Sequence, residues 1–140
     1  MTLDEDLKIE LNDEISRAHY TYERYKAQAT FALIYHEKDI GLDVLNSFVR
    51  VSDRLVRVNE NFHFVIYNFT TIDDAYGASR NLLKNLDKHF HNITSCIAID
   101  MPSKTDSTHM VMNKLYQIIL ETRKNSVTRI EYSDILDNTF

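Results

Sequence analysis

One short, uninterrupted apolar run constrains the fold of this chain more than any other feature of its sequence. Residues 31–35 read FALIY, with no charged position to face water. A run of this kind is typical of a central strand that is buried on both faces. Residues 93–99 are predicted to form another buried strand. A sheet that is buried on both faces needs helices above and below it, so we expect an α/β fold with one mixed sheet flanked by helices.

Helical periodicity fills the segments between the strands. Apolar residues at steps of three and four form a stripe that includes Tyr22 and Tyr25, and an acidic lead-in over residues 1–14 precedes it. Thr71 is predicted to cap a later helix. The predicted helices cover about residues 15–29, 42–53 and 71–90, with a last one through residues 111–119.

A hairpin is predicted in the middle of the chain. Two strands, residues 55–58 and 62–69, are joined by the turn Asn59-Glu60-Asn61, because asparagine tolerates the positive φ of a tight turn. Residues 127–132 are predicted as an edge strand and residues 133–140 as a C-terminal tail. The element order αβαββαβαβ, with about five strands and no repeat or linker, predicts a single domain over residues 1–140.

Composition excludes several classes of function. A net charge of -5 over 140 residues argues against a nucleic-acid-binding surface, and two distant glycines exclude a glycine-rich phosphate loop. The single cysteine, Cys96, excludes an internal disulfide, fits a reducing cytoplasm and is predicted to be a buried, inert thiol. The sequence shows no signal peptide and no apolar stretch of the roughly 20 residues that span a bilayer. We therefore expect a cytoplasmic protein that contacts no membrane.

The stretch from Arg50 to Tyr67 carries a resemblance to a known family. It contains R-x-x-D at Arg50 and Asp53, a strand that ends in Arg57, a hairpin and then an apolar strand. This order is similar to that of the GGDEF domains of bacterial diguanylate cyclases. The five signature positions of that family correspond here to Asn59, Glu60, Asn61, Phe62 and His63.

Further matches extend the resemblance over nearly the whole chain. Residues 93–98 resemble the family's T-x-S-x-G strand, and residues 114–117 resemble its A-L-Y-x-A-K helix. Near the start, Asp6, Leu7 and Asn12 resemble its D-x-L-T-x-L-x-N-R opening. The resemblance implies a GGDEF-like fold, in agreement with the predicted order of helices and strands.

The departures from the family imply that the domain is degenerate and catalytically inactive. Two-metal phosphoryl transfer needs converging carboxylates, but the first strand ends in residues 35–37 (YHE) and the hairpin offers only Glu60. Asn59 and Glu60 replace the signature glycines, and the segment that holds base and phosphates in the family is missing. Ile119 stands in place of a phosphate-contacting lysine. We therefore expect no metal, no cofactor and no enzymatic activity.

Arg50 and Asp53 match the family's inhibitory R-x-x-D site, where cyclic di-GMP binds as the product. An arginine fork can pair with phosphate or a guanine edge, and Arg54 and Arg57 make the neighbourhood basic. The alternative is a surface i,i+3 ion pair at a helix end, worth roughly a few tenths of a kcal/mol.

Other polar and aromatic residues are interpreted more simply. His36, His63, His89 and His91 lack carboxylate or thiolate partners at ligand spacing, so they are predicted to be surface or turn residues. Tyr20 lies off the apolar helix stripe and is either an ordinary surface residue or a contact residue for a partner.

The preferred interpretation is a regulatory domain that binds a protein partner or pairs with itself as a dimer. The alternatives are a cyclic di-GMP receptor and a residual nucleotide-binding enzyme. A receptor requires Arg50 and Asp53 to be exposed beside a second phosphate contact, whereas an enzyme requires Glu37 or Asp39 to face the hairpin across an open cleft. An interaction module requires neither, but it should show an exposed apolar patch.

Overall fold

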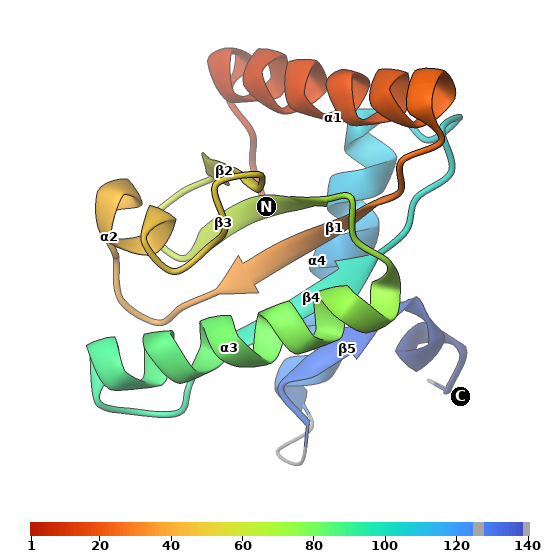
Figure 1. The fold of residues 1–140 in the computed structure, drawn as a ribbon. Helices are drawn as coiled ribbons and strands as arrows, with labels where there is room; N and C mark the ends of the chain where they lie inside the picture. Colours follow the sequence, from red (N-terminus) through yellow and green to blue (C-terminus); the bar gives the residue numbers. More distant parts are fainter. Residues whose placement is uncertain (125–127, 139–140) are drawn as a thin grey trace.

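The computed structural model describes residues 1–124 and 128–138, and these form one five-stranded mixed sheet flanked by helices (Figure 1). The strand order is β2-β3-β1-β4-β5. The central strand β1 runs antiparallel to both neighbours, β2 pairs antiparallel with β3, and β5 lies parallel to β4 at the edge. The strands are β1 (Ala29–Tyr35), β2 (Arg54–Arg57), β3 (Phe62–Asn68), β4 (Cys96–Asp100) and β5 (Ile130–Tyr132). The predicted fold class and the central position of β1 are thus confirmed.

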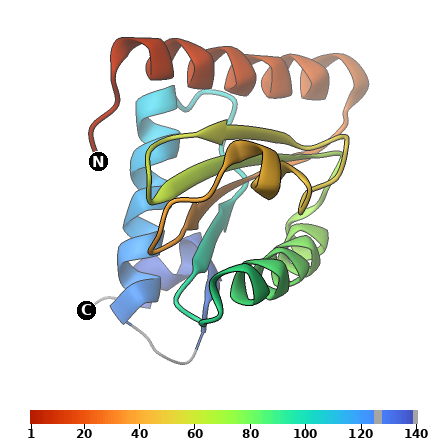
Figure 2. The same ribbon diagram turned by 90° about the vertical axis from the view of Figure 1, so that its left-hand side faces the viewer.

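Two apolar cores form on the two faces of the sheet, because side chains alternate along each strand. Phe31 and Leu33 of β1 join the core with helices α1 (Glu5–Tyr25) and α4 (Thr108–Lys124). Ala32 and Ile34 join the core with α2 (Leu42–Asn46) and α3 (Ile72–Phe90). Figure 2 shows α3 and α4 on opposite sides of the strands.

The first helix corrects the prediction of an acidic lead-in over residues 1–14. Helix α1 begins at Glu5, and Asp4 caps it by accepting a hydrogen bond from the Leu7 amide at 2.8 Å. Its buried stripe is Leu7, Leu11, Ile15 and Ala18. Acidic side chains in a first helical turn complement the helix dipole, so this segment is a helix start. The predicted stripe was wrong at its other end, because Tyr22 and Tyr25 lie beyond the core and are exposed.

The second helix is shorter than predicted. Helix α2 ends at Asn46 instead of about residue 53. A turn follows in which Asp53 and Arg50 exchange hydrogen bonds: the Asp53 amide donates to the Arg50 carbonyl, and the Arg50 amide donates to Asp53 Oδ2. An aspartate that binds nearby backbone competes with helix in this way.

The remaining elements follow the predicted order with shifted ends. Helix α3 has its predicted Thr71 cap, whose side chain accepts from the Asp74 amide. Strand β4 begins at Cys96, later than predicted, because Asn92 forms a side-chain turn with Thr94.

The C-terminal segment is more ordered than the predicted tail. The edge strand begins at Ile130, and Val127, part of its predicted range, lies outside the described residues, as do residues 139–140. A 3-10 helix (η1, Ser133–Asn138) then follows, from which Ile135 and Leu136 pack against the core. Within residues 1–124 and 128–138, no helix is both long and apolar enough to cross a bilayer.

Candidate functional site

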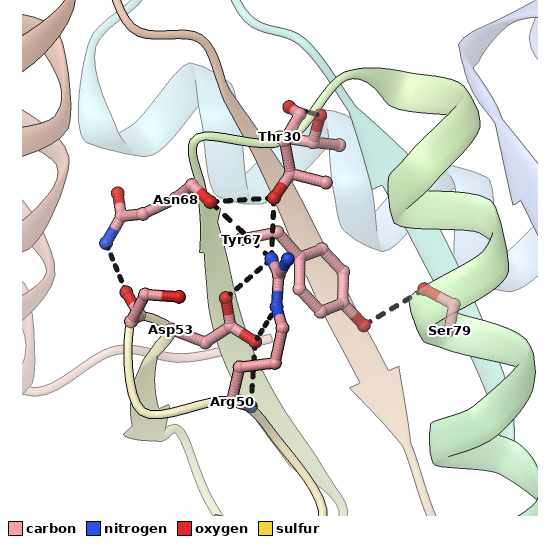
Figure 3. A network of polar contacts seen from close by, with 8 residues as sticks. Thr30, Arg50, Asp53, Tyr67, Asn68 and Ser79 are labelled. Atoms are coloured by element: carbon pink, nitrogen blue, oxygen red, sulfur yellow. Dashed lines mark hydrogen bonds and ion pairs between the residues drawn. The ribbon is translucent and has the colours of Figure 1, made fainter.

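The Arg50–Asp53 turn forms a dense polar network beside the end of β3 (Figure 3). Asp53 Oδ2 accepts from the Arg50 amide at 3.0 Å and from Arg50 Nε at 3.2 Å, while Oδ1 accepts from Nη2 at 2.9 Å. The side chain of Asp53 is 1% exposed and that of Arg50 is 51% exposed. This ion pair raises the pKa of Arg50 above its usual value, chiefly through the hydrogen bond to Asp53. A buried carboxylate is therefore paired with a half-exposed guanidinium.

The same network ties the turn to the ends of β1 and β3. Arg50 Nη2 donates to Thr70 Oγ1 at 2.6 Å, and Thr70 Oγ1 donates to the Asn68 carbonyl at 2.7 Å. Asn68 Nδ2 donates to the Ser52 carbonyl at 2.8 Å, and Thr30 Oγ1 donates to the Thr70 carbonyl at 2.9 Å. Segments distant in sequence therefore hold the turn in one conformation.

The four arginine and aspartate residues predicted for a cyclic di-GMP site do not gather at one place. Arg54 begins β2 and Arg57 ends it, so their α-carbons are about 10 Å apart along the strand. Because side chains alternate, the two arginines also point to opposite faces of the sheet. Arg54 lies next to the Arg50–Asp53 turn and is exposed, whereas Arg57 Nη2 pairs with Asp39 at 2.8 Å at the hairpin end.

The hairpin corresponding to the family signature is closed against the end of β1. The Asn61 amide donates to Asn59 Oδ1 at 2.8 Å, so a side-chain turn forms the connection. The hairpin was correctly predicted, but its predicted positive φ was not, because Asn59 and Asn61 are not among the described residues with positive φ. Asn61 Nδ2 donates to the carbonyls of His36 and Glu37, both at 3.1 Å, and the His36 amide donates to the Asn61 carbonyl at 2.9 Å.

The carboxylates near this hairpin do not converge. Glu37 and Glu60 are exposed, and Asp39 is engaged by Arg57 and by the Ile40 amide. Phe62 packs between Tyr35 and Tyr116, on the face of the sheet that α4 covers. In the part of the chain that the structure describes, no three His, Cys, Asp or Glu side chains are grouped to hold a metal ion.

His36 and His63 are buried, which corrects their prediction as surface or turn residues. Their rings are hydrogen-bonded to each other, with 2.7 Å between His36 Nε2 and His63 Nδ1. Burial lowers the pKa of both, that of His63 to about 4. The sequence held one signal for this: His63 lies within the apolar run of residues 62–67 (FHFVIY), in which all the other residues are aromatic or aliphatic. His89 and His91 are exposed, as predicted.

Cys96 is buried, as predicted, and we expect it to be unreactive in the folded protein. Burial raises the pKa of its thiol to about 11, so very little thiolate forms at pH 8. Because it is the chain's one cysteine, a disulfide-exchange reagent reports on it alone. With a chromogenic disulfide reagent at pH 8, the native protein should release no coloured thiolate within minutes. In denaturant it should release one equivalent per chain. Rapid reaction without denaturant would contradict the buried position.

The comparisons with known proteins bear on the fold. No protein-family model matches the sequence, and no curated protein does. Among solved structures, the GGDEF domain of DgcB from Caulobacter crescentus, in complex with c-di-GMP, matches with a TM-score of 0.68 at 12% identity, over 91% of this chain and 90% of that one. A variant of TpbB (YfiN) from Pseudomonas aeruginosa that comprises only the GGDEF domain matches with a TM-score of 0.67 at 13% identity, over 93% of this chain and 91% of that one.

A third match is longer than this chain. Diguanylate cyclase SiaD from Pseudomonas aeruginosa, solved with its activator SiaC, matches with a TM-score of 0.69 at 10% identity, over 89% of this chain and 57% of that one. This chain therefore spans little more than half of SiaD. The three matches confirm the GGDEF-like fold that the sequence resemblance implied, and at these identities they bear on the fold alone.

Proposed function

We propose that this chain is a catalytically inactive GGDEF-like signalling domain that regulates by binding proteins, in the first instance a second copy of itself. The observation that carries the inactivity is the closed hairpin. The Asn61 side chain bridges the hairpin to the His36 and Glu37 carbonyls, where the resemblance would place a metal and nucleotide site.

The charges at the same place support this proposal. Phosphoryl transfer by the two-metal route needs several oxygen ligands directed at one point. Asp39 is instead neutralised by Arg57, and Glu37 and Glu60 extend into solvent. The third possibility, a residual nucleotide enzyme, required Glu37 or Asp39 to face the hairpin across an open cleft, and this geometry does not favour it.

The inactivity is tested by incubating the purified protein with GTP and either Mg²⁺ or Mn²⁺ and measuring cyclic di-GMP by chromatography. An active GGDEF domain serves as the positive control. We expect no product above the protein-free blank. Formation of cyclic di-GMP that scales with protein concentration would overturn the inactive assignment.

The binding surface is proposed at the opposite end of the sheet, around the Arg50–Asp53 turn. Val51 at the tip of the turn is fully exposed, and Phe69 at the end of β3 is 67% exposed. Phe69 also has a φ of 57°, a left-handed conformation that costs a bulky residue about 1 kcal/mol. The polar network around Arg50 holds the backbone beside both residues, because it includes the Ser52 carbonyl after Val51 and residues 68 and 70 on either side of Phe69. Exposed apolar side chains on a backbone that is fixed in this way can serve as interface anchors.

Pairing through this surface is tested by sedimentation velocity over a wide range of concentrations. Wild type should shift from 16.5 kDa toward twice that mass as concentration rises. Phe69→Asn removes the ring and places a residue that tolerates the left-handed conformation, so it should weaken pairing without loss of stability. Ile93→Asn, an exposed residue before β4, is the matched control. A wild-type monomer at every concentration, or equal weakening by both variants, would refute pairing through this surface.

A second candidate function is cyclic di-GMP binding at Arg50, favoured by its half-exposed guanidinium and the neighbouring exposed Arg54. Only part of the receptor geometry is present, because the Asp53 side chain is 1% exposed and is held by Arg50. Binding would require Arg50 to share its hydrogen bonds with Asp53 and Thr70. Calorimetric titration with cyclic di-GMP tests it. Micromolar binding that is lost in Arg50→Ala and weakened in Arg54→Ala would support a receptor, and absence of heat at high ligand concentration would exclude it.

A further inference from the structure

The buried pair His36–His63 joins the signature hairpin to the end of β1. His36 follows β1 and His63 lies in β3, with neither exposed to solvent. The ring of Phe90, from the end of α3, stacks over His36 with 6.2 Å between centroids. The backbone of His36 itself takes part in the hydrogen bonds between Asn61 and the residues after β1.

The contacts of the two rings fix where their protons lie. His36 Nδ1 is 2.9 Å from the Lys38 carbonyl, which can only accept, so Nδ1 carries a proton. In the neutral ring His36 Nε2 is then an acceptor, and His63 Nδ1, 2.7 Å away, must donate to it. His63 Nε2 is therefore unprotonated, and it is buried without a hydrogen-bond partner.

An added proton has no favourable place in this arrangement. If His63 takes it, Nε2–H becomes a buried donor with no acceptor. If His36 takes it, its Nε2 must donate to His63 Nδ1, and the proton on His63 then moves to the same unpartnered Nε2. Either way the site gains a buried charge and an orphaned donor, both costly in an apolar environment.

The charged groups around the pair do not offset this cost. Asp39 favours the protonated form of both histidines, and Arg57 disfavours it. These two side chains pair with each other at 2.8 Å, so their effects on the histidines largely cancel. From helix α3, the uncharged ring of Phe90 stacks on His36. The neighbouring His89 contacts Phe90 and is exposed to solvent.

We propose that the His36–His63 pair is a proton-sensitive latch: in its neutral form it holds the signature hairpin against the end of β1, and proton uptake releases the hairpin. Release lets both rings reach water and breaks the Asn61 bridge to residues 36 and 37. The latch depends on neither the binding surface nor the inactivity proposed above. It makes the conformation of the hairpin sensitive to acid.

The sign of the pH dependence follows from the lowered pKa values. In the open state the histidines titrate near 6.5, whereas in the closed state that of His63 lies at about 4. The closed state is therefore fully favoured above pH 6.5 and loses its advantage as the pH falls toward 4. Each proton taken up raises the opening equilibrium about tenfold per pH unit in this window, so proton uptake by His63 alone gives roughly 300-fold in all.

Nuclear magnetic resonance tests the latch on the wild-type protein. Two-bond nitrogen–proton couplings of the imidazoles at pH 7.5 should show Nδ1–H on both His36 and His63. The hydrogen-exchange protection factor of the His36 amide, which donates to Asn61, should then fall at least about tenfold per pH unit below 6.5. A protection factor that does not change with pH, or a protonated His63 Nε2 at pH 7.5, would overturn the proposal.

Two matched variants distinguish opening that is caused by protonation of the His36–His63 pair from a general loss of stability in acid. In His63→Asn the amide can donate to neutral His36 or turn and accept from its protonated form, so the pH dependence of His36 protection should shrink. His91→Asn makes the same change at an exposed position with a φ of 56°, which asparagine tolerates, and should keep the full dependence. Equal behaviour of the two variants would refute a role for the pair.

Discussion

Truncating Leu11 to alanine should lower the free energy of unfolding by about 3 kcal/mol, enough to threaten the folded state of a domain this size. Leu11 is 0% exposed and lies in the core between α1, α4 and the sheet. The cost combines the lost burial of the side chain with a cavity that its neighbours only partly fill. Urea denaturation followed by circular dichroism measures it.

The matched control is Ile9→Ala, two residues earlier in the same helix. Ile9 is 59% exposed, so its truncation should change the free energy of unfolding by less than about 0.5 kcal/mol. If Leu11→Ala were equally mild, residues 5–14 would be a dispensable lead-in and helix α1 would not belong to the core at its start.

This contrast shows where the sequence predicted the fold and where it did not. The central strands were predicted from continuous apolar runs and from the Asn-rich hairpin. There the apolar sequence pattern matches the position of the strands, which are buried on both faces of the sheet. At α1 the buried Leu7 and Leu11 are surrounded by acidic residues, which favoured a solvent-exposed interpretation. Conversely, Tyr22 and Tyr25 continue the helical period past the edge of the core, and periodicity alone does not mark where the core stops.

The candidate site was predicted less completely, for a different physical reason. The R-x-x-D motif is local, and the structure does bring Arg50 and Asp53 together. The contacts that define its surroundings join residues far apart in sequence, such as Arg50 to Thr70 and His36 to His63. Such contacts depend on strand register, which fixes each facing residue only once the sheet is assembled.

Arg50→Ala should lower the free energy of unfolding by about 2 kcal/mol, although the side chain it removes is half exposed. The loss leaves the buried Asp53 carboxylate without its cation, and water that enters the vacated space limits the cost. Arg54→Ala removes an exposed arginine from the neighbouring strand and should cost less than about 0.5 kcal/mol.

The double variant Arg50→Ala/Asp53→Asn identifies the cause of that loss. Neutralising the carboxylate removes the orphaned charge and keeps an acceptor for the Arg50 main-chain amide, so the double variant should be more stable than Arg50→Ala alone. Denaturant titrations of wild type, the single variants Arg50→Ala and Asp53→Asn, and the double variant give the coupling. Additive losses would mean that Arg50 stabilises the turn through Thr70 instead of through Asp53. With the expected coupling, the double variant is also the better folded protein without Arg50 for the cyclic di-GMP titration, because absence of binding would then not reflect a destabilised turn.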